Sequence, residues 1–419
     1  MNWRTRLLLA VVCGVAVAAV YAGQPVLGPM GRDLGVPDDS LGWFVAVGQL
    51  GYLAGLVLLV PLGDILDRRR LIAAHLALVA AGTAITAAAP LAWTAFSGLA
   101  AAGLFAVVVQ TAVAYTASAS PPAEAGRNLG VVTSGVVIGI LGARVVAGVL
   151  ADLWGWRSVY LALAILAAVL AVLTLAVLPA DVRPGTARYG QVLRSFGGLF
   201  TRPVFLSRGL IAFFVFASFG TLWSGMALPL AGAPWHLDQT QIGLFGVAGL
   251  TGALGAARSG RWGDAGHARR VTGIALALLL ASWAAIGQLS WSMPLLILGV
   301  VLLDFAVQAV HVSNQHTLTS AYPGRASTTI GAYMVFYSLG SALGAAATTA
   351  LFDAAGWIGP TVLGATLALG ALATWAFSAH PPVPAEPAPA GSGPAAGWGA
   401  GPEGVTTRSG ACPGCGARS

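Results

Sequence analysis

Apolar stretches of about 18 to 25 residues recur along the chain, separated by short polar turns rich in glycine, proline and charged residues. A helix of that length crosses a hydrocarbon core about 30 Å thick. Six stretches are expected at 7–29, 41–62, 71–89, 92–117, 129–150 and 158–178, and six more at 208–230, 240–258, 271–289, 292–319, 327–351 and 358–378. The pattern predicts an all-α membrane protein with twelve transmembrane helices in two sets of six.

The segments outside the spans predict the domain organisation. We expect an N-terminal six-helix bundle over 1–178, a cytoplasmic linker over 179–207 and a C-terminal bundle over 208–379. The linker carries charged residues and a predicted amphipathic surface helix around 189–200. From residue 380 to 419 proline, alanine and glycine dominate, and such a composition favours a disordered cytoplasmic tail.

Composition supports a membrane protein, with 57% hydrophobic and only 8% charged residues. The net charge of +7 could suggest nucleic-acid binding, but the basic residues, all arginine, fall in short clusters between spans. With the N-terminus inside, only Arg32 and Arg157 fall outside and Arg144 lies within a span. The positive-inside rule then predicts that both termini are cytoplasmic, in a cell or inner membrane, with no nucleic-acid partner.

The chain offers no convincing metal, cofactor or signal-peptide signature. The first apolar run continues without a clear cleavage site, so we interpret it as a span. Cys412 and Cys415 supply two possible zinc ligands where a structural site needs four, so a chance pair is favoured. We therefore expect no metal and no cofactor.

Two loop motifs recur about 200 residues apart. Gly63 and Asp67, followed by Arg68, Arg69 and Arg70, close the second span. The eighth span ends with the corresponding residues Gly260, Asp264, Arg269 and Arg270. A second repeat places Asp152, Gly155 and Trp156 exactly 201 residues before Asp353, Gly356 and Trp357. Two homologous six-span halves follow, and in transporters built from such repeats the substrate site lies between the halves.

These residues resemble the major facilitator superfamily, across about residues 1–378. The family's loop signature, G-x-x-x-D-R-x-G-R-R, is matched by Gly63, Asp67 and Arg68, although the later glycine is missing and Ala265 replaces the first arginine of the second copy. The segments 21–25, 49–52, 61–64 and 304–315 resemble the bacterial arabinose-efflux-like and drug:proton-antiporter branch. The resemblance implies that the loop motif latches the cytoplasmic side. The alternative reading is a positive-inside anchor with a helix cap.

A polar stripe interrupts the tenth span. Asp304, Gln308, His311 and Gln315 share one face of a 3.6-residue period. Asp304 lies about twelve residues into the span, at a depth of ~18 Å. An acidic group there is a candidate for proton coupling or substrate contact, and the alternative is a structural aspartate bonded to a neighbouring helix.

Arg144 is the cation placed inside the bilayer, in the fifth span, which in the resembled fold lies between the halves. One hypothesis is that Arg144 and Asp304 interact across the halves and that protonation of Asp304 releases a gate. The alternative is an arginine satisfied by backbone carbonyls or substrate. Gly139 is followed by Ile140, where drug antiporters typically carry proline, and this departure weakens the argument for antiport.

His311 could relay protons from Asp304, or serve as a hydrogen-bonded structural histidine. Further cavity candidates come from spans that line the central path in the resembled fold. They are Tyr21, Gln24, Gln110, Tyr115, Trp223, Gln308, Asn314 and Gln315. Aromatic groups with few fixed charges favour small neutral or amphipathic substrates.

These features predict a secondary active transporter that works by alternating access. We do not expect an enzyme, because the sequence offers no nucleophile-base pair or metal triad. Proton-coupled efflux of drugs, sugars or metabolites is the preferred function. Proton symport and facilitated uniport remain alternatives, as does a non-transporting sensor or scaffold. The expected partners are a small-molecule substrate, protons and the lipid bilayer, and we expect a monomer.

Overall fold

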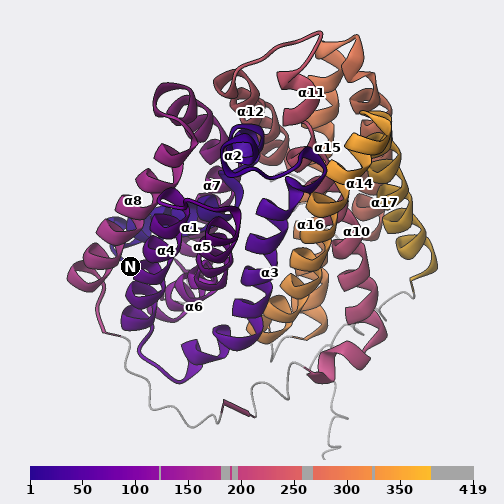
Figure 1. The fold of residues 1–419 in the computed structure, drawn as a ribbon. Helices are drawn as coiled ribbons and strands as arrows, with labels where there is room; N and C mark the ends of the chain where they lie inside the picture. The colour runs from indigo at the N-terminus through magenta and orange to yellow at the C-terminus, as the bar shows by residue number, and fades with distance from the viewer. Residues whose placement is uncertain (122–123, 181–188, 191–196, 257–267, 323–325, 379–419) are drawn as a thin grey trace, which may run out of the picture. The chain divides into compact units, whose positions relative to one another are not determined.

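The computed structural model describes residues 1–121, 124–180, 189–190, 197–256, 268–322 and 326–378, and within them it contains helices and no strands (Figure 1). Eleven helices among these residues are long and apolar enough to cross a membrane. The eighth expected span corresponds to a further helix, α12, which borders residues outside the described ranges. The predicted tail, with Cys412 and Cys415, also lies outside them.

The first half of the chain forms one run of helices. They are α1 (Trp3–Tyr21), η1 (Gln24–Val26), α2 (Leu27–Leu34), η2 (Asp38–Ser40), α3 (Gly42–Leu58), η3 (Val60–Asp64), α4 (Arg68–Ala87), α5 (Ala92–Phe105), α6 (Val108–Ala119), α7 (Ala125–Trp154) and α8 (Trp156–Val177).

The second half forms a matching run. It contains η5 (Gly198–Thr201), α10 (Pro203–Gly225), α11 (Ala227–Ala231), α12 (Gln239–Ala256), α14 (Ala268–Ile286), η7 (Gly287–Ser290), α15 (Met293–Ala321), α16 (Ala326–Ala355) and α17 (Ile358–Phe377). Half of the predicted amphipathic helix around 189–200, residues 191–196, lies outside the described residues, and η5 begins in the part that is described.

Several of the expected spans are interrupted within the described residues. The first breaks after Tyr21 and continues through η1 into α2, at the point where Pro25 lacks an N–H group. The fourth breaks between α5 and α6, and the seventh between α10 and α11. In a membrane such breaks are tolerated where protein covers the freed backbone groups, and the residues of η1 are buried.

Consecutive spans run in opposite directions, where an interrupted span such as α5 with α6 counts as one. We call the side where α1 begins and α17 ends the proximal side, and the opposite side the distal side. The α7–α8 turn on the distal side contains Gly155 with φ +78°, and 201 residues later Gly356 follows α16 with φ +59°. Glycine adopts this left-handed backbone without the steric cost of a Cβ atom, so the sequence repeat is also a conformational repeat.

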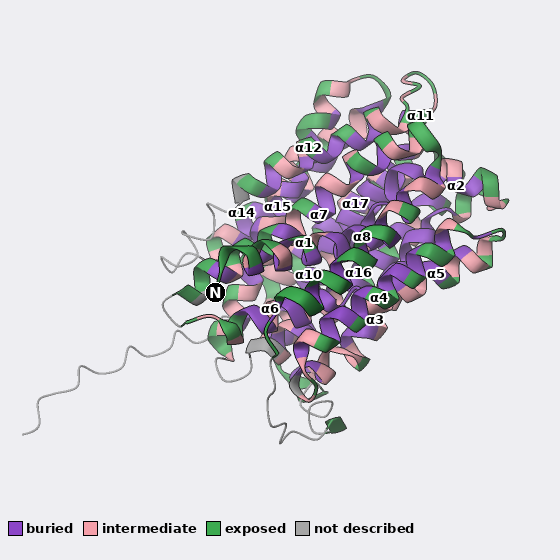
Figure 2. Ribbon diagram, turned by 90° about the vertical axis from the view of Figure 1, so that its left-hand side faces the viewer, coloured by how far each residue is buried: buried purple, intermediate pink, exposed green. Residues whose placement is uncertain are grey.

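The two halves meet along two helix pairs, α7 with α12 and α3 with α16. Figure 2 shows buried residues concentrated on the inner faces of the helices and exposed residues on the outside. Large apolar side chains are among the exposed ones, including Val172, Ile274 and Ile358, each more than 60% exposed. An apolar perimeter of this kind suits contact with lipid tails.

Candidate functional site

Arg144 lies fully buried on α7, between the two halves. Its Nε donates to Gln24 Oε1 at 2.8 Å, and its Nη1 donates to the Ile140 carbonyl at 2.8 Å. The guanidinium also sits 3.8 Å from the centre of the Trp223 ring on α10. Arginine suits this place because one planar group can donate in several directions and stack on an aromatic face.

Gln24 completes this link. While its Oε1 accepts from Arg144, its Nε2 donates to Ser224 Oγ on α10 at 3.3 Å. The break between α1 and α2 places Gln24 in η1, beside α7 and α10. The Gln24 side chain thus links η1 and α7 of the first half to α10 of the second half.

Asp304 lies on α15 and is also fully buried. Within the part of the chain that the structure describes, neither carboxylate oxygen forms a hydrogen bond. The indole N–H of Trp223 lies towards this carboxylate but makes no bond of ordinary geometry. Asp304 is eleven residues from the distal start of α15 and Arg144 is ten from the distal end of α7, so both lie about 15 to 17 Å deep.

Arg144 and Asp304 face the same interface without forming a salt bridge among the described residues. The arginine instead bonds to Gln24 and a backbone carbonyl, which is the alternative that the sequence leaves open. The helix α12 passes close by, since a Cβ atom on Gly249 would lie 2.8 Å from both Asp304 Oδ2 and Trp223 Cζ2. The two charges are close enough to attract each other, but they are not paired.

A small cavity of about 10 Å³ lies beside the arginine. It is lined by Gln24, Pro25, Arg144, Trp223, Met226, Ala227 and Ile242. The second terminal nitrogen of Arg144, Nη2, is buried and has no acceptor among the described residues. A cavity of this size admits about one water molecule, so in this conformation the site is closed to larger ligands.

An aromatic cluster continues from Trp223 towards the proximal side. Phe219 lies 6.2 Å from Trp223 and 6.4 Å from Tyr21, measured between ring centres. The Tyr21 hydroxyl bonds to the Tyr337 hydroxyl on α16, across the halves. Phe216 packs against Tyr337 with ring centres 4.0 Å apart. The cluster gives the interface an apolar wall with two hydroxyl groups.

His311 bonds to neighbours other than Asp304. Its Nδ1 lies 3.1 Å from the Tyr333 hydroxyl, and its Nε2 lies 3.0 Å from Gln315 Nε2. This arrangement resembles the structural histidine that the sequence leaves as an alternative to a proton relay. Gln308, between Asp304 and His311 on the stripe, is half-buried.

The other cavity candidates are dispersed. Gln110 donates to the Tyr52 hydroxyl at 3.3 Å, within the first half. The Tyr115 hydroxyl donates to the Pro179 carbonyl at 3.1 Å. Asn314 is buried and donates to the Arg208 carbonyl at 3.4 Å. None of these bonds reaches Arg144 or Asp304. Among the cavity candidates, the described part of the chain brings Tyr21, Gln24 and Trp223 next to the charged pair.

Several buried polar residues at the interface escape the sequence analysis. Gln49 on α3 is fully buried, and neither atom of its amide has a hydrogen-bond partner among the described residues. Tyr333, Tyr337 and Ser341 follow one another at four-residue spacing on α16. The same stripe argument that selects Asp304 would have selected these three residues, since they share one helix face.

The loop motif after α3 is built around Arg68, which is buried. Its Nε donates to the Gly63 carbonyl at 2.8 Å, and Nη1 donates to Ser118 Oγ on α6 at 3.2 Å. Asp67 caps α4 by accepting from the Arg69 amide at 2.9 Å. Arg70 lies 3.9 Å from Asp67 and is exposed. In this conformation these contacts of the motif all lie within the first half.

Only part of the second copy of the motif is described, because Gly260 and Asp264 lie outside the described residues. Arg269 stacks 4.9 Å from the centre of the Trp375 ring and donates to the Ser378 carbonyl at 3.3 Å. Arg270 is exposed.

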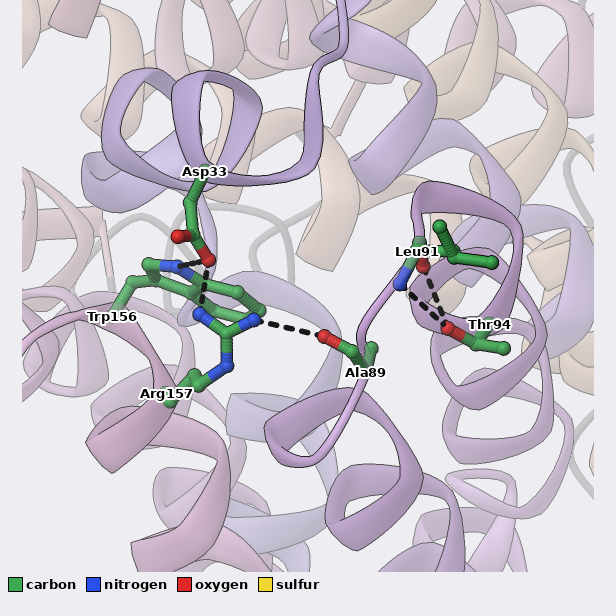
Figure 3. A network of polar contacts seen from close by, with 6 residues as sticks. All are labelled: Asp33, Ala89, Leu91, Thr94, Trp156 and Arg157. Carbon is green, nitrogen blue, oxygen red and sulfur yellow. Dashed lines mark hydrogen bonds and ion pairs between the residues drawn. The ribbon is translucent and has the colours of Figure 1, made fainter.

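A polar network braces the first half on the distal side (Figure 3). Asp33 accepts from the Trp156 indole at 3.1 Å and forms an ion pair with Arg157. Arg157 also donates to the Ala89 carbonyl at 2.8 Å. These contacts join α2, the start of α8 and the α4–α5 turn. Arg157, which the sequence predicts to lie on the outer side of the membrane, therefore has a structural role at this position.

The helical halves, the interrupted spans and the buried charges between them define a multi-pass membrane transporter. The model of the Major Facilitator Superfamily matches residues 7–231 and 209–407. The chain is 38% identical over 369 residues to the uncharacterized transporter YgaY of Escherichia coli O157:H7, covering 88% of this chain and 94% of that protein. The chain therefore belongs to the Major Facilitator Superfamily and is a transporter rather than an enzyme.

Two further similarities are more distant. The multidrug resistance protein Stp of Mycobacterium tuberculosis is 29% identical over 163 residues, which is 38% of this chain and 30% of that protein. Among solved structures, a bacterial homologue of the human lysosomal transporter Spinster, in an inward-facing and occupied conformation, gives a TM-score of 0.70 at 16% identity. That match covers 89% of this chain and 93% of the other, and it supports the fold.

Proposed function

We propose that the protein exports small organic molecules in exchange for protons, by alternating access of the site between the halves. The observation that carries this proposal is Asp304, a fully buried carboxyl group with no hydrogen bond to either oxygen among the described residues. A charged group in such a place is costly unless it is paired or protonated. A movement that exposes it to water or brings a cation closer changes that cost and therefore its affinity for a proton.

The partner for this movement is Arg144. It is carried by α7 in the first half, while Asp304 and Trp223 belong to the second half. A rocking motion between the halves therefore changes the separation of the two charges. Because Gln24 holds the guanidinium at 2.8 Å, the arginine moves with the first half. Proton binding at Asp304 weakens its attraction to Arg144, which couples the proton to the position of the halves.

The substrate side of the proposal is supported by the aromatic cluster between the halves. The cluster presents large apolar faces and few polar groups, and its members are Tyr21, Phe219, Trp223 and Tyr337. Such walls suit neutral or amphipathic compounds. Relatives that are named as multidrug resistance or multidrug efflux proteins point the same way.

We also infer the domain bounds of the chain and its orientation in the membrane. The N-terminal bundle comprises 1–178, the linker 179–207, the C-terminal bundle 208–379 and the tail 380–419. The proximal side, where most arginines gather, is cytoplasmic in the cell or inner membrane. The transporter works as a monomer, because the two halves within one chain enclose the site.

Reconstitution into proteoliposomes with an acidic lumen and an internal pH-sensitive dye tests the proposal. Antiport predicts that a transported compound enters the vesicles while the lumen becomes more alkaline. Entry that instead requires an alkaline lumen would establish symport, and entry with no proton movement would establish uniport.

Two variants make the test specific. Asp304→Asn is expected to abolish proton movement while leaving exchange of labelled for unlabelled compound measurable. Asp353→Asn changes an exposed acid on the distal side and is expected to behave like the parent. Proton-driven accumulation that survives in Asp304→Asn would remove the central argument for this residue.

A further inference from the structure

The repeated residues Asp152, Gly155 and Trp156 lie at the distal end of α7, where the proposed transport cycle gives them no task. Figure 1 shows α12 beside α7 at this end of the molecule, and the two helices pack against each other. Asp152 belongs to the first half and the start of α12 belongs to the second. The contact between them therefore bridges the halves.

The Asp152 carboxylate lies on the N-terminus of α12. Oδ1 accepts from the Gln239 amide at 3.2 Å, and Oδ2 accepts from the Thr240 amide at 2.6 Å and from the Thr240 hydroxyl at 2.5 Å. The first N–H groups of a helix lack partners within the helix. The positive end of the helix dipole lies at the same place and attracts an anion. Asp152 thus acts as an N-terminal cap supplied by another helix.

The helix does not depend on this cap in order to form. Asp238 precedes α12 and accepts from the Gln241 amide at 2.7 Å, while the Gln241 side chain accepts from the Asp238 amide at 3.0 Å. That reciprocal pair is a capping box within the helix itself. Since α12 carries its own cap, the contact with Asp152 adds a link between the halves.

The link continues towards the charged site. Gly148 on α7 lies against the Gln239 carbonyl, where a Cβ atom would overlap, and Gly243 lies against the Arg144 carbonyl. Asp152 and Arg144 are two helical turns apart on α7. Separation of the halves at Asp152 therefore also moves the backbone that carries Arg144.

The corresponding junction in the other pair of helices uses a different residue. Thr349 on α16 accepts from the Gly42 amide at 3.1 Å and donates to the Asp39 carbonyl at 2.8 Å. Asp353, the repeat counterpart of Asp152, makes no hydrogen bond or ion pair within the described residues. The chain therefore contains a natural comparison for Asp152.

We propose that Asp152 is a detachable cap. It stabilises the closed distal face, and its hydrogen bonds to α12 break when that face opens. A distal cavity of about 260 Å³ lies between the halves next to this contact, with Gln239 and Phe352 in its lining. Release of the cap would open the wall of this cavity at Gln239. The inference assumes alternating access from the proposed function but requires neither proton coupling nor any particular substrate.

The test is a distance measurement between spin labels by double electron–electron resonance on the full chain. Labels are placed at Leu91→Cys and Ile358→Cys, which are exposed distal positions in opposite halves. Cys13 is replaced by alanine and the two tail cysteines by serine. Asp152→Ala is expected to raise the ratio of the long-distance to the short-distance population about fivefold, the effect of losing one typical cap.

The comparison variants isolate the cap. Asp152→Asn keeps one acceptor oxygen but turns an NH2 donor towards the other N–H group, so it is expected to give a shift between those of the parent and Asp152→Ala. Asp353→Ala is expected to leave the ratio unchanged. Thr240→Val removes only the hydroxyl contact and should give a smaller shift in the same direction, which provides a second reading if Asp152→Ala does not fold.

The outcomes are distinct. Equal ratios for the parent, Asp152→Ala and Thr240→Val would overturn the cap, as would equal shifts in Asp152→Ala and Asp353→Ala. The measurement uses no substrate and no pH gradient, so a chain that fails as a proton antiporter can still pass it. Asp304→Asn combined with Asp152→Ala should retain the shift.

Discussion

Replacing Arg144 by lysine keeps the positive charge and removes the geometry that holds it. The guanidinium donates from Nε to Gln24 and from Nη1 to the Ile140 carbonyl, each at 2.8 Å, and stacks 3.8 Å from the centre of the Trp223 ring. A lysine ammonium is a compact donor on a flexible stem and cannot meet all three groups at once. The Gln24 oxygen is then left without its donor, whereas the Ile140 carbonyl still accepts from the backbone N–H of residue 144 within α7.

The size of the effect follows from those contacts. A hydrogen bond to a charged group contributes about 1.5–3 kcal/mol. A desolvated cation over an indole ring adds about 2 kcal/mol. Loss of one bond or of the stacking therefore weakens the link between the first half and Trp223 by about 2 kcal/mol. At 1.36 kcal/mol for each factor of ten, we expect substrate-driven proton movement to fall about 30-fold.

The assay is proton movement in proteoliposomes with a compound that the parent protein transports. Arg127→Lys is the matched control, because Arg127 lies on the same helix and is exposed. Circular dichroism and gel filtration establish that both variants are folded. Transport by Arg144→Lys within about threefold of the parent would show that charge alone suffices and would refute the argument from geometry.

Two further predictions concern the neighbours of this site, and a third concerns the distal polar network. Trp223→Leu keeps an apolar side chain but removes the stacking face, and it should slow proton movement about tenfold, whereas Trp223→Phe should retain more of it. Gly249→Ala introduces a Cβ atom 2.8 Å from an Asp304 oxygen, so transport should fall while the melting temperature changes little, and parent-like transport would contradict the close packing. Arg157→Ala breaks an ion pair with Asp33 that is 41% and 45% exposed, so thermal unfolding should register a loss of about 1 kcal/mol or less, and complete unfolding would contradict a surface brace.

The fold follows from sequence patterns because lipid imposes a simple rule. Backbone groups in hydrocarbon must bond within their own segment, so a long apolar run specifies a helix and its approximate ends. The expected tenth span at 292–319 agrees closely with α15 at Met293–Ala321. The breaks were harder to predict: Pro25 signals the one before η1, but no proline marks the break between α5 and α6. That break depends on the helices packed around it.

The amino-acid pattern alone identifies the unusual residues: one acid and one arginine deep in apolar spans, and a segment repeated after 201 residues. Their contacts depend on how the helices pack. Arg144 meets Gln24, which is 120 residues earlier in the chain, and Asp152 meets Thr240, which is 88 residues later. Helical periodicity gives a residue its depth and its face, but which partner stands opposite depends on how separate helices pack, and local sequence does not encode that choice.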